Sequence, residues 1–160
     1  NQQISRYISH IIVFETNPQD SEQISAFFKI SGNLERIGDH AVNICEYTQL
    51  LEQKHIGFSQ KAKAEIQSMR ETSLEAIRSL GDMSRVDENA LKTIEGFEQK
   101  IDDMTLDYRQ NQMVRLREGA CSDEACTLYS EMLTDFERIG DHILNIGQEL
   151  APKEAIPLKP

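Results

Sequence analysis

The residues in this chain most able to do chemistry are acidic pairs spaced four positions apart. Glu35 is followed by Asp39, and Glu137 by Asp141, each pair within the segment Glu-Arg-Ile-Gly-Asp-His. At this spacing two side chains lie one turn apart on the same side of a helix, within a few ångströms of each other. Each pair would therefore bring two carboxylates together.

Both pairs are expected to face the interior of a helical bundle. Glu35 and Gly38 fall inside an apolar stripe with helical spacing, made of Ile24, Phe27, Phe28, Leu34, Ala41, Val42 and Cys45. Glu137 and Asp141 lie in or beside a second stripe, made of Leu128, Met132, Leu133, Phe136, Ile143 and Leu144. Because like charges repel more strongly where water is excluded, such inward pairs need a compensating partner.

Two kinds of partner can offset the repulsion between the acids. A divalent or trivalent cation takes several oxygen ligands, and one carboxylate can bridge two ions. Alternatively, Arg36 and Arg138, or other basic side chains, neutralise the acids in buried ion pairs. The spacing alone leaves both interpretations open.

A third pair, Glu98 and Asp102, has the same spacing in the preceding predicted helix. It is flanked by the predicted core positions Ile94, Phe97, Ile101 and Met104. We expect this pair to be the facing half of the site presented by Glu137 and Asp141. Two further acids repeat the spacing one step around the helix and should face solvent: Asp103 and Asp107.

Each repeated segment also contains a glycine between its acids and a histidine after them. Gly38 and Gly140 each cost about 1 kcal/mol relative to alanine inside a helix. Close helix packing explains them most simply, although an approaching ion would also need the space. His40 and His142 lie roughly 140° around the helix from the glutamates, so we expect hydrogen bonding and not metal ligation from them.

The composition is that of a globular protein with an acidic surface. Hydrophobic residues make up 39% of the 160 residues and charged residues 28%, and the net charge is −10. This charge argues against a nucleic-acid partner, because binding phosphate backbones needs a basic surface. The longest apolar run, residues 11–14, is too short to span a membrane. We interpret Cys121 and Cys126 as structural thiols and Cys45 as a core residue, in a reducing compartment.

Apolar residues recur every three or four positions, and no segment alternates as a half-buried strand would, so helices are predicted throughout. Short polar turns between them favour an all-α, antiparallel bundle. Residues 151–160 carry three of the four prolines and are expected to form an extended tail. Five helices are predicted. The first two run from Gln3 to Glu15 and from Asp20 to Lys54. The other three start after Ser59, Asp87 and Ser122, and they end at Gly81, at Glu118 and before Pro152.

An internal repeat organises these helices. The segment from Leu34 to Ile44 recurs from Phe136 to Ile146, an offset of 102 residues. We therefore expect a repeat of two three-helix bundles, with a complete second copy at residues 58–150. Residues 1–57 would hold only the last two helices of the first copy, whose opening helix is missing. We expect the chain to be a fragment of a longer protein.

The two Glu-Arg-Ile-Gly-Asp-His segments, followed by Ala-Val-Asn-Ile and Ile-Leu-Asn-Ile, resemble the PhoU family. That resemblance implies metal clusters, with iron, zinc or nickel as the ion, and a role in controlling phosphate transport or signalling. The family's pattern of an acid, three residues and an aspartate, with its partner motif on the preceding helix, carries over to six metal ligands: Glu35, Asp39, Glu98, Asp102, Glu137 and Asp141.

The stretch from Arg115 to Cys126 is similar to the C-terminal PhoU-like region of bacterial sodium/phosphate cotransporters. That similarity implies a cytoplasmic regulatory domain attached, in the full-length chain, to a transmembrane transporter domain in the cell membrane. The alternative is a free-standing PhoU-type adaptor that works with phosphate transport components. Formation of a homo-oligomer is left open.

Two further hypotheses come from other functional classes. One is a metal-dependent phosphohydrolase with Glu98, Asp102, Glu137 and Asp141 around two ions that activate water. No separate base or phosphate-clamping arginine cluster stands out in the sequence, so we expect no enzymatic activity. The other is a purely structural protein whose acidic segments are ion-paired packing seams.

Overall fold

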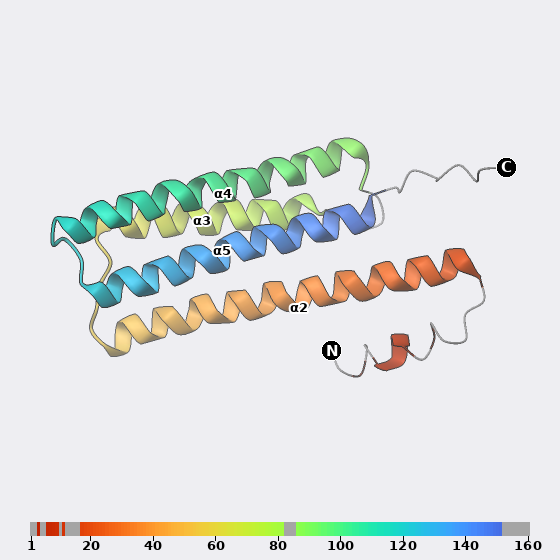
Figure 1. Ribbon diagram of the computed structural model, residues 1–160, viewed down its shortest axis with the longest axis horizontal. Helices are drawn as coiled ribbons and strands as arrows, with labels where there is room; N and C mark the ends of the chain where they lie inside the picture. The colour runs from red at the N-terminus through yellow and green to blue at the C-terminus, as the bar shows by residue number, and fades with distance from the viewer. Residues whose placement is uncertain (1–2, 4–5, 10, 12–16, 82–85, 152–160) are drawn as a thin grey trace.

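The computed structural model describes residues 3, 6–9, 11, 17–81 and 86–151, and these contain four long helices and no strand (Figure 1). Successive helices reverse direction and α5 lies beside α2, α3 and α4, which confirms the predicted all-α antiparallel bundle. The predicted helix at residues 3–15 and the tail after residue 151 lie mostly outside the described residues. The four helices are α2 (Pro18–Gln53), α3 (Gln60–Ser79), α4 (Glu88–Arg117) and α5 (Asp123–Leu150).

The starts of α3, α4 and α5 follow the predicted caps. The side chains of Ser59, Asp87 and Ser122 each accept a hydrogen bond from the backbone N–H three residues later, at 3.2, 2.8 and 3.2 Å. Such caps satisfy N–H groups that have no partner inside the helix. Beyond the ends of α3 and α4, Gly81 and Gly119 adopt φ values of +54° and +68°, which glycine tolerates without strain.

The boundaries of α2 differ from the prediction. Pro18 begins the helix, two residues before the predicted cap, because proline suits a first position whose N–H would lack a partner. The Asn17 side chain donates a hydrogen bond to Asp20 Oδ2 at 2.8 Å in this first turn. The helix ends at Gln53, one residue before the predicted end, and His55 just beyond it takes a left-handed conformation with φ +53°.

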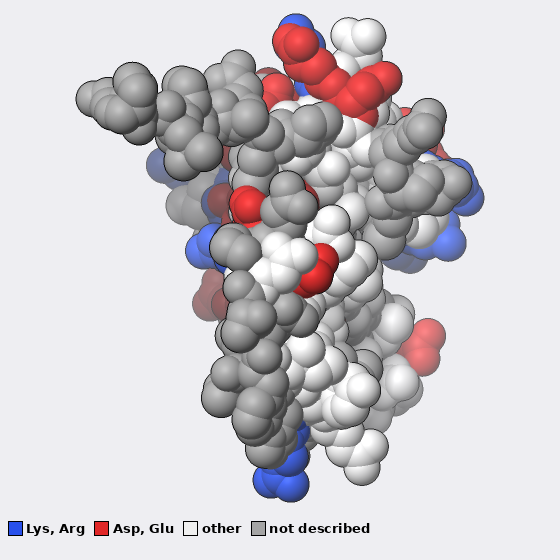
Figure 2. All heavy atoms as spheres, turned by 90° about the vertical axis from the view of Figure 1, so that its right-hand side faces the viewer, with Lys and Arg blue, Asp and Glu red and all other residues white. Residues whose placement is uncertain are grey.

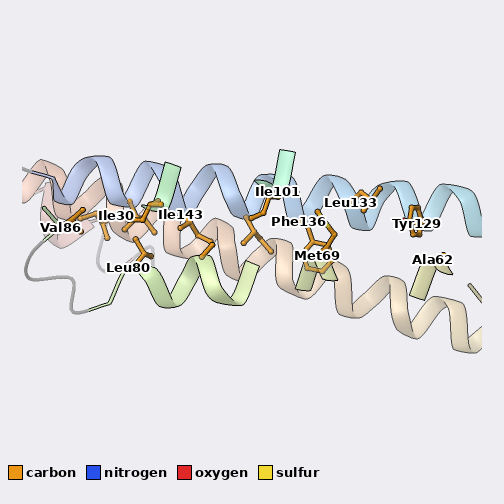
Figure 3. Packing of buried hydrophobic residues seen from close by; sticks show 14 residues of the cluster. Ile30, Ala62, Met69, Leu80, Val86, Ile101, Tyr129, Leu133, Phe136 and Ile143 are labelled. Carbon is orange, nitrogen blue, oxygen red and sulfur yellow. The ribbon is translucent and has the colours of Figure 1, made fainter. Parts of the chain in front are cut away.

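Helix α5 lies at the centre of the described bundle. It contacts α2, α3 and α4, whereas α5 is the only described helix that α2 contacts. Met69 of α3, Ile101 of α4 and Leu133 of α5 are fully buried in the same cluster, and Figure 3 shows them pointing into the space between their helices. The apolar stripe predicted for α5 is therefore confirmed as its packing face.

The apolar stripe predicted to point inward from α2 is exposed, and that prediction is wrong. Phe27, Leu34 and Val42 are 62%, 45% and 55% exposed, and Cys45, predicted to be in the core, is exposed as well. The helix carries two apolar faces, and no described helix covers this one. The face that packs on α5 carries residues seven apart, the spacing of two helical turns: Ile30, Ile37, Ile44 and Leu51.

Across the described helices, none contains a stretch both long and apolar enough to cross a membrane.

Candidate metal centre

Three of the six predicted ligands converge where α4 meets α5. Glu98 and Asp102 of α4 and Asp141 of α5 each place one carboxylate oxygen within 4.8 Å of the other two. All three side chains are partly buried. We call this group the α4/α5 acidic cluster. Because its members come from two helices, packing holds the acids together and not only the spacing along one helix.

The glycine between the acids of α5 explains this close approach. A Cβ atom at Gly140 would lie 3.3 Å from Cδ1 of Ile101, which is fully buried. Ile101 directly precedes Asp102, and Gly140 directly precedes Asp141. The packing of isoleucine on glycine therefore supports the packing interpretation and positions the acids that follow.

The acids on α4 lie in an unfavourable electrostatic environment. Burial raises the pKa of Glu98, and the neighbouring charges of Asp102 and Asp141 raise it further. Burial also raises the pKa of Asp102, together with the charges of Glu137 and Asp141. Neither Glu98 nor Asp102 has an ion-pair partner among the residues that the structure describes.

One oxygen of this cluster also lacks a hydrogen bond. Asp102 Oδ1 is buried, and no described group donates to it. A desolvated carboxylate oxygen without a donor is costly, and such atoms are uncommon in folded proteins. A bound cation would offset both the missing donor and the repulsion between the acids.

Glu137 lies beside the cluster but is held by an arginine that the sequence analysis missed. Arg109 Nη2 donates to Glu137 Oε2 at 3.0 Å and to Thr134 Oγ1 at 2.9 Å. Arg138 Nη1 donates to Asp141 Oδ2 at 3.0 Å, but this arginine is 58% exposed, and such pairs contribute little. The ion-pair interpretation thus applies to Glu137 and only weakly to Asp141.

The first acidic pair lies away from this cluster. Glu35 and Asp39 are exposed on α2, so the prediction that they face the bundle is wrong for the described part of the chain. Nothing lies within 4 Å of a Cβ atom built on Gly38, in contrast to its counterpart Gly140. The difference arises because α4 covers the acidic face of α5, whereas no described helix covers that of α2. The role of Glu35 and Asp39 as ligands stays a prediction.

The two histidines form hydrogen bonds, as predicted, and these bonds link α2 to α5. His40 Nδ1 lies 2.6 Å from Asp135 Oδ1, and His142 Nδ1 lies 2.9 Å from Asn33 Oδ1. The two rings stack with centroids 5.5 Å apart. Asn33 and Asp135 are themselves 102 residues apart, so the repeated segments pack against each other with approximate two-fold symmetry. The repeat offset was the signal in the sequence that would have identified this contact.

The donor set of the α4/α5 acidic cluster fits a hard cation. Glu98, Asp102 and Asp141 offer only carboxylate oxygens, which are the preferred ligands of hard divalent and trivalent ions. Two of these acids lack a cationic partner, and one carries the buried oxygen without a donor. The arrangement can therefore bind a metal ion through side chains of both helices.

Comparison with known proteins gives two matches. A family model described as the PhoU domain matches residues 1–48 and 61–150. Over 142 residues the chain is 30% identical to the phosphate-specific transport system accessory protein PhoU homolog 1 of Thermotoga maritima (strain ATCC 43589 / DSM 3109 / JCM 10099 / NBRC 100826 / MSB8), covering 87% of this chain and 60% of the relative. No solved structure matches the chain.

Proposed function

The chain belongs to the PhoU family, and from this premise we propose that it regulates phosphate transport through a metal ion bound between α4 and α5. Glu98, Asp102 and Asp141 would hold the ion, with Glu137 available as a further ligand. Iron, zinc and nickel are the ions to test first. The regulatory part of the proposal is supported by the name of the relative, which is an accessory protein of a phosphate transport system.

One observation carries the metal part of the proposal: acids from two helices converge without enough basic groups to neutralise them. Glu98, Asp102 and Asp141 lie within 4.8 Å of one another at their carboxylate oxygens. A bound ion would link α4 to α5, so metal loading would change the stability of their contact. A regulator can use such a change to pass a signal to its partner.

The regulatory role takes one of two forms. The chain is either a cytoplasmic domain of a sodium-dependent phosphate cotransporter or a free-standing adaptor of a phosphate transporter. The matched relative supports the second form no less than the first, since its name describes an accessory protein. Sequencing the gene upstream of residue 1 distinguishes them: membrane-spanning segments in the same reading frame support the cotransporter, and a start codon close by supports the adaptor.

The proposal assigns no catalytic reaction to this cluster. Arg109, which lies beside the cluster, is bonded to Glu137 and Thr134. It is therefore already engaged and not presented to a phosphoester. A panel of phosphoesters incubated with iron-, zinc- or nickel-loaded protein should show no turnover above that of the free metal. Metal-dependent hydrolysis that is lost in Asp102→Asn would favour the phosphohydrolase hypothesis instead.

The metal content of purified protein tests the proposal. The native chain should be prepared without a metal-affinity tag and compared with Asp102→Asn and Asp103→Asn by elemental mass spectrometry. Asp103 is exposed and adjacent to Asp102, so its substitution removes the same charge outside the cluster. We expect near-stoichiometric metal in the native chain and in Asp103→Asn, and loss in Asp102→Asn. Equal metal content in all three, or none after soaking, would refute the metal part.

A further inference from the structure

A second polar site lies on the opposite side of α5 from α3, between α2 and α5. A groove of about 380 Å³ separates these helices near the start of α2 and the end of α5. Its polar lining comes from Lys29, Asn33 and Arg36 on α2 and from Asn145, Gln148 and Glu149 on α5. Figure 2 views this end of the bundle and shows acidic side chains gathered at the top, where α4 begins, with basic groups on both sides below.

Arg36, an exposed residue of α2, presents a positive charge to this groove. It forms no ion pair among the described residues, whereas its repeat counterpart Arg138 is bonded to Asp141. Arg36 lines the groove together with Asn145 and Gln148, so it lies beside α5. An unpaired arginine is notable on a chain of net charge −10.

Lys29 adds a second positive charge at the edge of the groove. Its Nζ lies 2.7 Å from Glu149 Oε1, and the lysine side chain is 53% exposed. Glu149 is only 18% exposed, but the Lys29 end of the pair is in contact with solvent, so Lys29 can turn toward an anion. Two cations and one acid leave the groove with a net positive charge.

The repeat counterpart of this groove has the opposite charge. The residues 102 positions from Lys29 and Asn33 are Glu131 and Asp135, and the residue 102 positions before Gln148 is Glu46. These three differences make the first groove more positive than its counterpart, and only Glu149, whose counterpart is Tyr47, acts in the other direction. The basic character therefore belongs to this one groove and does not come from the repeat itself.

The remaining polar groups suit an anion with several oxygens. Asn145 Nδ2 makes only a long contact of 3.4 Å with Asn33 Oδ1, so it can donate elsewhere. Gln148 offers another side-chain amide along the same wall. A guanidinium, an ammonium and two amides match a tetrahedral oxyanion, because charge-assisted and bidentate bonds to phosphate are the strongest that arginine makes.

We propose that the groove between α2 and α5 binds a phosphate group through Arg36 and Lys29, with Asn145 and Gln148 as further donors. Inorganic phosphate and the phosphate of a small phosphomonoester share this chemistry. The site contains none of the proposed metal ligands, so its occupancy does not require the metal. Since α5 is the only described helix that α2 contacts, a bound phosphate would strengthen that contact.

Isothermal titration calorimetry tests this proposal. The metal-free protein is titrated with inorganic phosphate and, separately, with phenyl phosphate. Arg36→Ala should weaken binding of the preferred ligand by at least about tenfold. Lys92→Ala removes the same charge from an exposed pair on α4 and should leave affinity unchanged. Glu149→Gln should tighten binding, since it removes the acid from the groove and frees Lys29.

The outcomes distinguish inorganic phosphate from a phosphomonoester as the ligand. They also distinguish this groove from the proposed metal site. Tighter binding of phenyl phosphate than of inorganic phosphate would identify a phosphomonoester as the ligand type, and the reverse would identify the free ion. Binding that persists in Asp102→Asn but is lost in Arg36→Ala would support the groove whether or not the metal is found. No heat from either ligand, or equal binding by native chain and Arg36→Ala, would overturn the proposal.

Discussion

Asp102 is the member of the α4/α5 acidic cluster that combines repulsion from neighbouring acids with a missing hydrogen-bond donor. It is partly buried, faces the charges of Glu137 and Asp141, and keeps one oxygen without a donor. Arg109 offsets this only in part, because its guanidinium is bonded to Glu137. Without a metal, Asp102 should therefore destabilise the fold, and with one it should stabilise it.

Replacing Asp102 should separate these two effects. In metal-free protein we expect Asp102→Asn to raise the free energy of unfolding by about 0.5 kcal/mol or more, because a like charge is removed. In metal-containing buffer the variant should gain no further stability, whereas the native chain should. Urea denaturation with and without metal measures both quantities, and Asp103→Asn should behave as the native chain in each. A metal-dependent gain retained in Asp102→Asn would contradict this account.

At this scale the sequence identified the acids but not all their neighbours. Four-residue spacing and the flanking core positions were enough to pair Glu98 and Asp102 with Asp141. The contact of Arg109 with Glu137 could not be predicted, because it joins residues on different helices and follows no repeat. Such contacts depend on how far each helix is rotated about its axis, which apolar periodicity defines only coarsely.

Among the contacts between elements, a buried ionic group ties α3, α4 and α5 together at one end of the bundle. Arg115 Nη2 donates to Glu65 Oε2 at 2.7 Å, and the Tyr129 hydroxyl donates to the same oxygen at 2.5 Å. The Arg115 guanidinium also lies 5.1 Å from the centre of the Tyr129 ring. Because Glu65 and Arg115 are only 14% and 10% exposed, breaking this group should be costly.

Replacing Glu65 should therefore destabilise the bundle at neutral pH. We expect Glu65→Gln to lower the free energy of unfolding by about 3 kcal/mol, since Arg115 is left buried without its carboxylate. Glu75→Gln, on the exposed face of the same helix, should change it by less than about 0.5 kcal/mol. Urea denaturation of the two variants provides the comparison, and equal effects would contradict the assignment.

The same group should make stability depend on pH in a defined direction. Burial by itself would raise the pKa of Glu65, but the bonds from Arg115 and Tyr129 outweigh it and lower the pKa. Because the pKa of Glu65 is lower in the folded than in the unfolded state, its ionised carboxylate stabilises the fold at pH values above the unfolded pKa of about 4.3. This stabilisation is lost as the pH falls toward the folded pKa. The stability difference between native chain and Glu65→Gln should thus shrink from about pH 7 to below about pH 4. A constant difference across this range would argue against the lowered pKa.

Two glycines test how closely the helices pack. A Cβ atom at Gly147 would lie 2.9 Å from Cδ1 of the fully buried Ile94, whereas one at Gly38 would meet nothing within 4 Å. Gly38→Ala should raise the free energy of unfolding by up to about 1 kcal/mol through helix propensity alone. Gly147→Ala should instead lower it by about 1 to 3 kcal/mol, because the buried Ile94 side chain must shift or α4 and α5 must move apart. Thermal or urea unfolding of both variants gives the comparison, and a stabilised Gly147→Ala would show that the contact is looser.

For the molecule as a whole, the main feature is the difference between α2 and α5, the two helices that carry the repeated segment. Among the described helices, α5 is covered on several sides, whereas α2 is covered only by α5 and exposes Phe27, Leu34 and Val42. The residues 102 positions after Phe27 and Leu34 are Tyr129 and Phe136, at 0% and 4% exposure. Equivalent positions of the repeat thus have opposite environments in the described part of the chain.

Alanine substitutions on α2 test which of its faces is packed. Ile30→Ala, at a 7% exposed position, should lower the free energy of unfolding by about 2 to 4 kcal/mol. Leu34→Ala, at a 45% exposed position on the other face, should change it by about 0.5 kcal/mol or less. Chemical denaturation of the two variants decides the point. A larger cost for Leu34→Ala would mean that the exposed stripe is covered after all.

At this largest scale the sequence predicted the fold class, the helix caps at Ser59, Asp87 and Ser122, and the repeat. It did not predict which face of α2 is packed, because both faces of that helix are apolar. Internal symmetry made the face containing Glu35 look equivalent to the face containing Glu137. Coverage by other helices, and not the pattern within the helix, makes the two faces different.

The most direct test of the central claim is anomalous diffraction from crystals grown with iron, zinc or nickel. We predict a peak enclosed by Glu98, Asp102 and Asp141 between α4 and α5, and no comparable peak in crystals of Asp102→Asn. A peak at Glu35 and Asp39 alone, or an empty α4/α5 acidic cluster in metal-soaked native crystals, would contradict the claim that these three acids form a metal centre.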